Sequence, residues 1–370
     1  MKILFFYLDA FSQTGGIENF NKALMKALSD LSEVNNMNFQ AVSVYDSEPD
    51  ERYIDKNNYK GFKKNKIRSS LYAIKTSRKY DQVILGHINL AIVGIVIKLI
   101  RPSARIILIA HGIEVWEKLH FIKGAFLKRV DKILAVSNFT KEKLVNVNMI
   151  NPAKVEILHN TLDPYFKIPD TFEKPTYLLN RYKINKEAKI ILTVTRITDT
   201  ENEKGYDKVI AVLPELIKDN PNVVYMLAGK YTPKAGSRLK KLVEDKNIES
   251  NFILTGYIPE SEMTDHYLLA DVFVLPSKKE GFGIVFIEAA ACGVPVIAGN
   301  MDGSVDALKN GEFGKLVNPD NYNQIVHEIK DVLNRRTAKT TVSYNVMELF
   351  SFKNYQASLK NLLLNQRERN

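Results

Sequence analysis

Short apolar runs, each followed by a stretch with helical spacing, constrain the fold of this chain more than any other feature. The runs are rich in Val, Ile and Leu and are continuous rather than alternating, which is typical of strands buried on both faces of a parallel sheet. In the first half they are Ile3–Tyr7, Ala41–Tyr45, Gln82–Leu85, Arg105–Ala110, Lys132–Val136 and Val155–Leu158. In the second half they are Ile190–Val194, Val223–Ala228, Phe252–Thr255, Val272–Leu275, Val294–Ala298 and Gly314–Val317.

Helical patterns fill the intervals between these runs. Clear examples are Ile17–Ser29, Asn138–Val147 after Ser137 as N-cap, Tyr206–Lys218 and Glu260–Ala270. Alternating strands and helices predict doubly wound α/β units. The series occurs twice in the 370 residues and is interrupted at 163–182, a stretch of proline, aromatic and polar residues. We therefore expect two Rossmann-like domains, at 1–165 and 166–344, with a last helix at about 345–370 (Tyr344 to Arg367) crossing back to the first.

Composition excludes several classes of protein. Hydrophobic residues make up 45% and charged residues 25% of the chain, as in soluble globular proteins. The single cysteine, Cys292, excludes an intramolecular disulfide and a multi-cysteine metal site. The most apolar stretch, Val83–Ile100, contains His87, Asn89 and Lys98, and we favour a strand, a turn and a buried helix over a membrane span. The opening MKILFFYLDA is interpreted as a buried strand rather than a signal peptide, because Asp9 interrupts it.

Positive charge is concentrated in the first half of the chain. The chain has 52 Lys and Arg against 42 Asp and Glu, a net charge of +10. Residues 56–79 contain basic side chains interleaved with aromatic and aliphatic ones, and no acid. Such a segment suits an anionic membrane surface, a nucleic acid or simply a solvated helix face. We favour the membrane surface and expect no nucleic acid partner.

The strongest functional signal follows the strand Val272–Leu275, where ligands of open α/β sheets bind. It reads PSKKEGFGIVFIEAAACGVPVI over residues 276–297. The backbone N–H groups of Gly283, Ile284 and Val285, with the helix dipole, predict an anion site. Glu280 and Glu288, eight residues apart, would accept hydrogen bonds from hydroxyl groups such as those of a sugar. Ordinary charges at the start of a helix are the alternative interpretation.

This order of residues matches the E-x7-E signature of retaining nucleotide-sugar glycosyltransferases with the GT-B fold. The sequence resembles glycosyltransferase family 4 over nearly its whole length. The resemblance implies two Rossmann-like domains that face one another across a cleft. It also implies that Glu280 binds hydroxyls of the donor sugar, that Phe282 and Gly283 contact the sugar through their backbone, and that Glu288 holds the ribose.

Further motifs extend the resemblance. They lie in the first domain and after the first strand of the second domain. Gly15 and Gly16 open the first helix, where the family approaches the donor diphosphate or the acceptor. His111 follows a strand, where the family places a histidine near the transferred sugar. Arg196 and Lys204 follow the first strand of the second domain, and the resemblance assigns both cations to the diphosphate of the donor.

The next turns of the second domain also match. Gly229 and Lys230 correspond to a glycine-rich turn of the family, and Tyr257 and Ile258 lie where its backbone cradles the nucleotide base. Residues 300–306 differ, because the family often has two glycines there and this chain has one. The nearest approach to a metal-binding Asp-x-Asp motif is Asp199-Thr200-Glu201, which we interpret as a solvated loop.

The resemblance implies a retaining transfer of a hexose-type sugar from a nucleoside-diphosphate sugar, with a uridine nucleotide expected. The acceptor would be a glycan or a lipid-linked glycan in bacterial surface polysaccharide or glycoconjugate synthesis. We expect no metal and no cofactor besides this co-substrate, and a cytoplasmic enzyme peripheral to the inner face of the cell membrane. Two alternatives stay open: an epimerase or phosphorylase of the same fold, and a non-catalytic protein that binds sugar nucleotides or nucleic acid.

Overall fold

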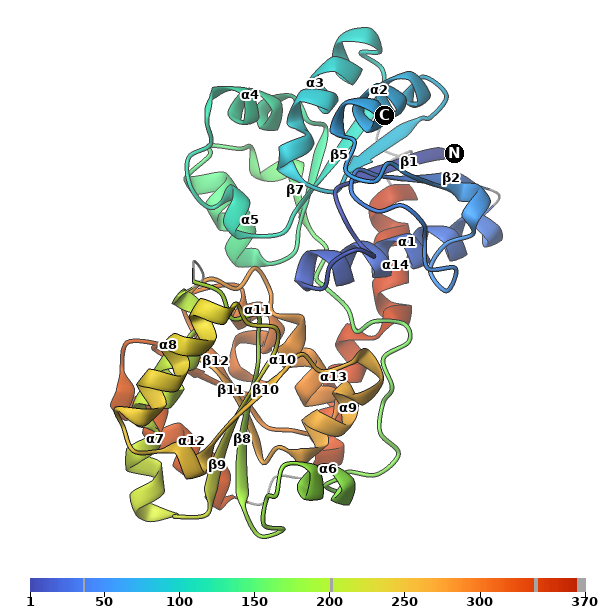
Figure 1. Ribbon diagram of the computed structural model, residues 1–370. Coiled ribbons are helices and arrows are strands. Elements are labelled where there is room, and N and C mark those ends of the chain that lie inside the picture. The colour runs from blue at the N-terminus through green and yellow to red at the C-terminus, as the bar shows by residue number, and fades with distance from the viewer. Residues whose placement is uncertain (36, 200–201, 336–338, 365–370) are drawn as a thin grey trace. The chain divides into compact units, whose positions relative to one another are not determined.

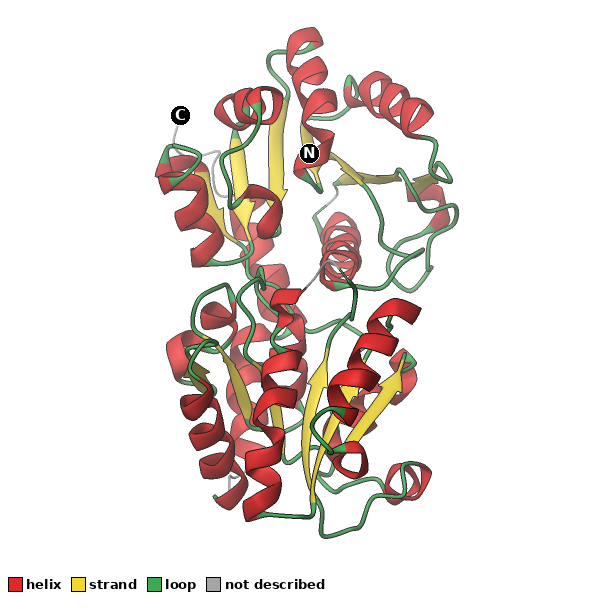
Figure 2. Ribbon diagram, turned by 60° about the vertical axis from the view of Figure 1, so that its left-hand side comes forward, coloured by secondary structure: helices red, strands yellow, loops and turns green. Residues whose placement is uncertain are grey.

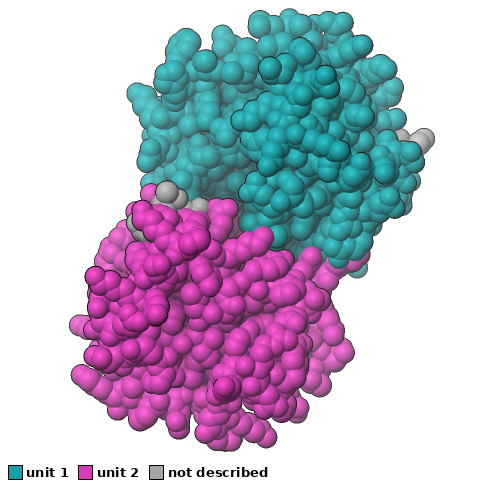
Figure 3. Space-filling model, in the orientation of Figure 1, with its two compact units in different colours: residues 1–164, 350–370 teal, residues 165–349 magenta. Residues whose placement is uncertain are grey.

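The chain divides into two compact units (Figure 3). Unit 1 contains residues 1–164 and 350–370, and unit 2 contains residues 165–349. The computed structural model describes the chain except at residues 36, 200–201, 336–338 and 365–370. Both units are built on a parallel sheet flanked by helices (Figure 2). This is the α/β class that the sequence predicts.

Unit 1 has a seven-stranded sheet in the order β3-β2-β1-β4-β5-β6-β7. Its strands are β1 (Lys2–Tyr7), β2 (Asn38–Ser43), β3 (Tyr59–Gly61), β4 (Gln82–Leu85), β5 (Arg105–Ala110), β6 (Lys132–Ala135) and β7 (Val155–Ile157). All pairs are parallel, and β1 is an interior strand, where Ile3 pairs with Phe39 on one side and Gln82 on the other.

Helices cover both faces of this sheet (Figure 1). They are α1 (Gly16–Val34), α2 (Lys66–Ser77), α3 (Ala91–Ile100), α4 (Phe121–Arg129), α5 (Asn138–Asn146) and α14 (Phe352–Leu364). Leu4 and Phe6 point into a core shared with α2, α3, α4 and α5. Because successive strand residues alternate between faces, Phe5 and Tyr7 belong to the other face, which α1 and α14 cover. Ser137 caps α5 as expected, accepting a hydrogen bond from the amide of Thr140.

Two details of unit 1 differ from the sequence analysis. The basic segment 56–79 contains an edge strand, β3, as well as α2, and the sequence analysis did not predict this strand. The segment 83–100 forms a strand, a turn and a helix as predicted, but α3 is buried on one side only. Ile92 and Leu99 on its outer side are exposed.

Unit 2 has a six-stranded parallel sheet in the order β10-β9-β8-β11-β12-β13. Its strands are β8 (Lys189–Val194), β9 (Val223–Ala228), β10 (Phe252–Gly256), β11 (Val272–Leu275), β12 (Val296–Gly299) and β13 (Lys315–Val317). Its helices are α6 (Thr176–Arg181), α7 (Tyr206–Asp219), α8 (Pro233–Glu244), α9 (Glu260–Leu269), α10 (Ile284–Ala291), α11 (Ser304–Ala307), α12 (Tyr322–Asn334) and α13 (Lys339–Phe350). One core joins α7, α8 and α12 to the sheet.

The end of the chain forms two helices where the sequence analysis expected one. Helix α13 ends at Phe350 and α14 begins at Phe352. The carbonyl oxygen of Phe350 accepts hydrogen bonds from the Leu162 amide (3.1 Å) and the Thr161 hydroxyl (2.8 Å). These bonds satisfy a carbonyl at the end of α13 that has no partner within the helix. Among the described helices, none is long and apolar enough to cross a bilayer.

Candidate active site

The carboxyl ends of β8 and β11 form the switch point of the unit 2 sheet. From β8 the chain continues to β9 and β10 on one side, whereas β11, β12 and β13 lie on the other. Loops that leave the sheet at such a point diverge and leave room for a ligand. The two loops concerned are 195–205 after β8 and 276–283 after β11. They carry the residues that the sequence analysis singled out most strongly.

An ion pair joins these two loops. The Lys204 Nζ atom lies 2.8 Å from Oε1 of Glu280, and their side chains are only 18% and 16% exposed. The backbone adds a second link, because the amide of Lys278 donates to the carbonyl of Glu203 at 3.0 Å. The structure thus brings a predicted phosphate-binding cation and a predicted sugar-binding carboxylate into direct contact across 76 positions of sequence.

Helix α10 begins directly after the Glu280 loop. Phe282 is buried, and Gly283 precedes the helix with a left-handed backbone (φ 86°) and no side-chain cap. The first amides of an α-helix have no partner within the helix. Here they belong to Ile284, Val285 and their neighbours, at the start of a helix with no acidic residue in its first turn. The anion site that the sequence predicts at this helix start therefore stays a prediction.

Glu288 lies one helical turn after Ile284 on α10, and its side chain is nearly buried. Its Oε2 atom accepts a 2.7 Å hydrogen bond from the hydroxyl of Tyr267 on α9. Burial, reinforced by the negative charge of Glu288, raises the pKa of Tyr267 well above its ordinary value, so this hydroxyl stays a donor. Burial also raises the pKa of Cys292, which leaves the single cysteine an unreactive thiol.

The turns after β9 and β10 form the other side of this edge. A side chain at Gly229 (φ 138°) would place its Cβ 1.8 Å from the carbonyl oxygen of Thr195, so only glycine fits there. Lys230 lies with its Nζ 4.6 Å from the centre of the Tyr257 ring, which is half exposed. Ile258 beside it is buried. The exposed ring is the face that this turn offers to a ligand.

Arg196 also belongs to this edge, since it follows β8 by two positions and is exposed. The acidic loop beyond it is described only in part. Asp199 accepts a 3.3 Å hydrogen bond from the Thr232 hydroxyl, whereas Thr200 and Glu201 lie outside the described residues. Within the described residues no group of three or more His, Cys, Asp or Glu side chains is arranged to hold a metal ion.

Asp302, which the sequence analysis did not single out, lies against the Glu280 loop. It is fully buried and accepts hydrogen bonds from the Glu280 amide (2.8 Å) and the Ser277 hydroxyl (2.7 Å). The only available signal was the departure from the usual two glycines at 300–306.

The predicted residues of unit 1 lie at the carboxyl edge of its own sheet. Gly15 and Gly16 begin α1, and a side chain at Gly16 would meet nothing within 4 Å. His111 follows β5, is buried, and has Nε2 2.8 Å from the carbonyl oxygen of Gly86. Because a carbonyl only accepts, Nε2 carries the proton. Burial lowers the pKa of His111 to about 4, so the imidazole is neutral at pH 7.

Unit 1 also holds titratable groups that sequence reasoning missed. The His87 ring is stacked 6.3 Å from that of His111, and burial lowers its pKa to about 4. Asp46 lies three residues after β2 and accepts hydrogen bonds from the amides of Ala10, Phe11 and Ser12 in the loop before α1. Burial and the adjacent Asp9 carboxylate raise the pKa of Asp46 to about 6.

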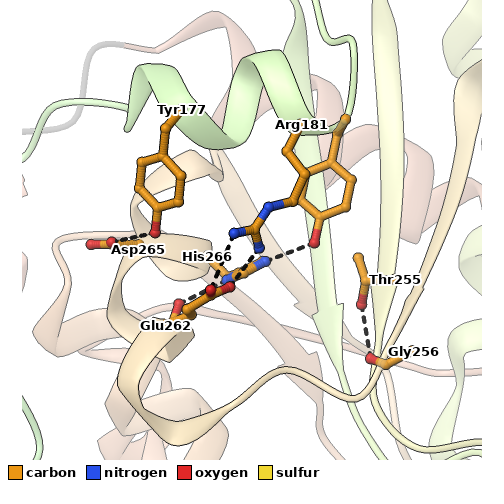
Figure 4. Close-up of polar contacts among 8 residues, drawn as sticks. Tyr177, Arg181, Thr255, Gly256, Glu262, Asp265 and His266 are labelled. Atoms are coloured by element: carbon orange, nitrogen blue, oxygen red, sulfur yellow. Dashed lines mark hydrogen bonds and ion pairs between the residues drawn. The ribbon is translucent and has the colours of Figure 1, made fainter.

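A separate polar cluster fastens α6 to α9 (Figure 4). Arg181 forms two hydrogen bonds to the carboxylate of Glu262, at 2.5 and 3.1 Å. His266 is buried, and its Nδ1 lies 2.7 Å from the Glu262 carbonyl, so Nδ1 donates and Nε2 accepts from the Tyr182 hydroxyl at 2.8 Å. The cluster contains none of the predicted site residues, and we assign it to the stability of unit 2.

Comparison with known proteins finds a matching family model for each unit. The family model "Glycosyltransferase Family 4" matches residues 14–166, and "Glycosyl transferases group 1" matches residues 178–347. The chain is 28% identical over 285 residues to a GDP-mannose-dependent alpha-(1-6)-phosphatidylinositol monomannoside mannosyltransferase of Mycolicibacterium smegmatis, covering 72% of each chain. It is 25% identical over 225 residues to the capsular polysaccharide biosynthesis glycosyltransferase CapM of Staphylococcus aureus, covering 58% of this chain and 55% of CapM.

The structure of Anabaena HepE in complex with UDP and glucose matches with a TM-score of 0.80. It is 16% identical in sequence, and the match covers 99% of this chain and 100% of HepE. This likeness shows a common fold for the whole chain. The chain belongs to the family 4 type of GT-B glycosyltransferases.

Proposed function

We propose that this protein is a retaining glycosyltransferase that moves a hexose-type sugar from a nucleoside-diphosphate sugar to a glycan or lipid-linked acceptor. The observation that carries the proposal is the contact between Lys204 and Glu280 at the switch point of the unit 2 sheet. It puts a phosphate-binding cation beside a carboxylate that accepts from hydroxyls. A nucleotide sugar requires both groups where its sugar joins the diphosphate, a cation for the phosphates and an acceptor for the sugar hydroxyls.

We propose that residues of unit 2 bind the donor. In this arrangement Lys204 and Arg196 take the diphosphate, together with the first amides of α10. Glu280 accepts hydrogen bonds from hydroxyls of the sugar. Glu288, oriented by Tyr267, accepts from the ribose, and the base lies on the turn that carries Tyr257.

Transfer follows from the charge on the leaving group. The bond between the anomeric carbon and the diphosphate oxygen breaks, and the acceptor oxygen bonds to that carbon on the same face. The proton of the acceptor hydroxyl passes to the leaving diphosphate. Lys204 and Arg196 stabilise the charge that develops there, so the proposal needs no divalent cation. His111, neutral and held by Gly86, is proposed to contact the transferred sugar.

The relatives guide the choice of donor and pathway. A uridine donor is supported by HepE, which was solved with UDP, and a guanosine donor by the GDP-mannose-dependent enzymes. We propose UDP, and a role in bacterial surface polysaccharide or glycoconjugate synthesis in line with CapM.

We also propose that unit 1 docks on an anionic membrane through segment 56–79. Helix α2 exposes Ile67 and Leu71 one turn apart, with Arg68 and Lys75 exposed on the same helix. Neighbouring α3 and α4 continue the apolar surface, and most of the exposed large aliphatic and aromatic side chains of unit 1 lie on these three helices: Ile67, Leu71, Ile92, Leu99, Ile100, Phe121 and Ile122. An amphipathic surface with basic residues is typical of helices that lie in a membrane interface.

The transferase is tested by release of nucleoside diphosphate from UDP-, GDP- and ADP-sugars, with and without a lipid-glycan extract. We expect release that depends on the extract, survives EDTA and is lost in Glu280→Ala. NMR of the product should show the anomeric configuration of the donor. Binding of every donor without release would contradict the proposal.

Membrane docking is tested by sedimentation with vesicles that contain anionic lipid. Replacing Lys63, Lys64 and Lys66 by Ser should weaken binding about 100-fold, because each basic residue near such a surface contributes about 1 kcal/mol. A matched variant removes three exposed lysines from α8 in unit 2: Lys234, Lys240 and Lys241. Equal binding by the two variants would refute docking through this segment.

A further inference from the structure

Asp302 is a buried carboxylate whose hydrogen bonds come from two different loops. Its Oδ2 atom accepts from the Ser277 hydroxyl at 2.7 Å and from the Glu280 amide at 2.8 Å. Its Oδ1 atom accepts from the amide of Ser304, the first residue of α11, at 2.9 Å. One side chain therefore ties the loop after β12 to the loop after β11.

The backbones of these loops also touch. A Cβ at Gly303 would lie 2.0 Å from the carbonyl oxygen of Gly281, which leaves room for glycine alone. The amide of Gly303 donates to the carbonyl of Glu280 at 2.8 Å. Both backbone groups of Glu280 are thus hydrogen-bonded. Its N–H donates to the Asp302 carboxylate, and its C=O accepts from the amide of Gly303.

The charge of Asp302 has no cationic partner among the described ion pairs. Burial and the nearby Glu280 raise its pKa to about 6, so keeping this carboxylate charged costs stability. Neutral hydrogen-bond donors compensate only part of that cost. The lysines of the neighbouring loops are paired elsewhere: Lys278 with Asp320, Lys279 with Glu203, and Lys204 with Glu280.

We propose that Asp302 is a positioning residue of the donor site. It fixes the backbone of Glu280, and through it the direction in which the Glu280 carboxylate meets Lys204 and the donor sugar. This inference rests on the proposed function of Glu280. It explains why an acid stands in a loop where the family often has two glycines: the carboxylate gives the loop after β11 a fixed shape that glycine cannot give.

The test compares Asp302→Ala, Asp302→Asn and the control Asp306→Asn, which changes the same charge four residues further on. Asn keeps an oxygen for the Ser277 and Glu280 donors but turns its NH2 group toward the Ser304 amide, whereas Ala keeps no acceptor. We expect Asp302→Ala to lower kcat/KM for the nucleotide sugar about 10- to 100-fold, the loss typical of a misplaced contact. Its affinity for UDP alone should change less than threefold, and Asp302→Asn, which keeps the bonds from Ser277 and Glu280, should recover part of the loss. Equal losses for UDP and UDP-sugar, or no rescue by Asn, would overturn the inference.

A second measurement needs no donor. Hydrogen exchange of the ligand-free chain should show faster exchange at residues 277–283 in Asp302→Ala and wild-type exchange in Asp306→Asn. Unchanged exchange in Asp302→Ala would overturn the positioning role even if activity falls. Faster exchange in a protein that binds no nucleotide sugar would support the positioning role and refute the proposed function. If Asp302→Ala does not fold, Ser277→Ala, which removes one of the three bonds, provides the same comparison.

Discussion

Replacing Glu280 by Gln should strengthen the binding of UDP and weaken the binding of UDP-sugar. Lys204 Nζ lies 2.8 Å from Oε1 of Glu280, and both side chains are less than one fifth exposed. A diphosphate that binds this cation competes with the carboxylate for it. Part of the ion pair's energy is therefore lost from nucleotide affinity. Glu280→Gln keeps the shape of the side chain and releases Lys204.

The geometry sets the size of the effect. A hydrogen bond to a charged group contributes about 1.5–3 kcal/mol, and because this pair is partly exposed and only part of its energy is lost, we take about 0.7–1.4 kcal/mol. Since about 1.4 kcal/mol is a factor of ten, Glu280→Gln should bind UDP about 3- to 10-fold more tightly. Lys204→Met should bind UDP at least about tenfold more weakly, because it removes a cation from the diphosphate. For UDP-sugar both variants should lose affinity, because the sugar hydroxyls lose an ionised acceptor or the diphosphate loses its cation.

Calorimetric titration of UDP and UDP-sugar measures these signs directly. The control is Glu249→Gln, which removes an exposed charge elsewhere in unit 2 and should change neither affinity. Unfolding curves establish that each variant keeps its fold. Wild-type or weaker affinity of Glu280→Gln for UDP, in a folded protein, would refute the competition between carboxylate and diphosphate.

Three further changes test other parts of the structure. Tyr267→Phe removes a hydroxyl donor to the buried carboxylate of Glu288 and should destabilise the chain by about 1–3 kcal/mol in urea unfolding; a smaller loss would mean that this bond contributes little to stability. Burial lowers the pKa of His266 below its ordinary 6.5. Below about pH 6.5 the unfolded chain therefore binds a proton at this ring more readily than the folded chain does, and the melting temperature should fall as the pH falls. Tyr182→Phe removes the bond to the neutral ring and should make this fall shallower, and an unchanged slope would exclude the pair as its source. Gly16→Ala adds a methyl group in open space within α1, so the melting temperature should not fall, whereas turnover should drop if a ligand approaches this backbone; full turnover would remove Gly16 from the site.

The strands that could be predicted are those whose residues are buried on both faces. Thr193 is the one polar residue in the two runs Ile190–Val194 and Val272–Leu275. Both runs form strands within one residue of the predicted limits. Strand β3 was missed because Tyr59, Lys60 and Gly61 form a short edge strand with only Tyr59 buried. A strand of this kind has no hydrophobic run to identify it, because its parallel pairing with β2 and the burial of one side chain, Tyr59, hold it in place.

The break between α13 and α14 was missed for a different reason. Residues 344–367 keep helical spacing throughout, so local propensity favours one helix. The break at Ser351 is stabilised by the bonds from Thr161 and Leu162 to Phe350, almost 190 residues away along the chain. Contacts of this length leave no periodic signal in a single sequence.

The candidate site was predictable in its location and residue types but not in its pairings. Parallel strands bring their carboxyl ends to one edge, so Lys204 and Glu280 were expected to be neighbours of a common ligand. That they also bind each other depends on side-chain geometry that spacing does not specify. Asp302 shows most clearly what the sequence alone cannot predict. Its role depends on a hydrogen bond from the amide of Glu280, 22 positions earlier in the chain. A buried acid with only neutral donors is costly to keep in a loop that glycine could form. Such a cost is expected where the position of another group, here Glu280, matters more than the stability of the loop itself.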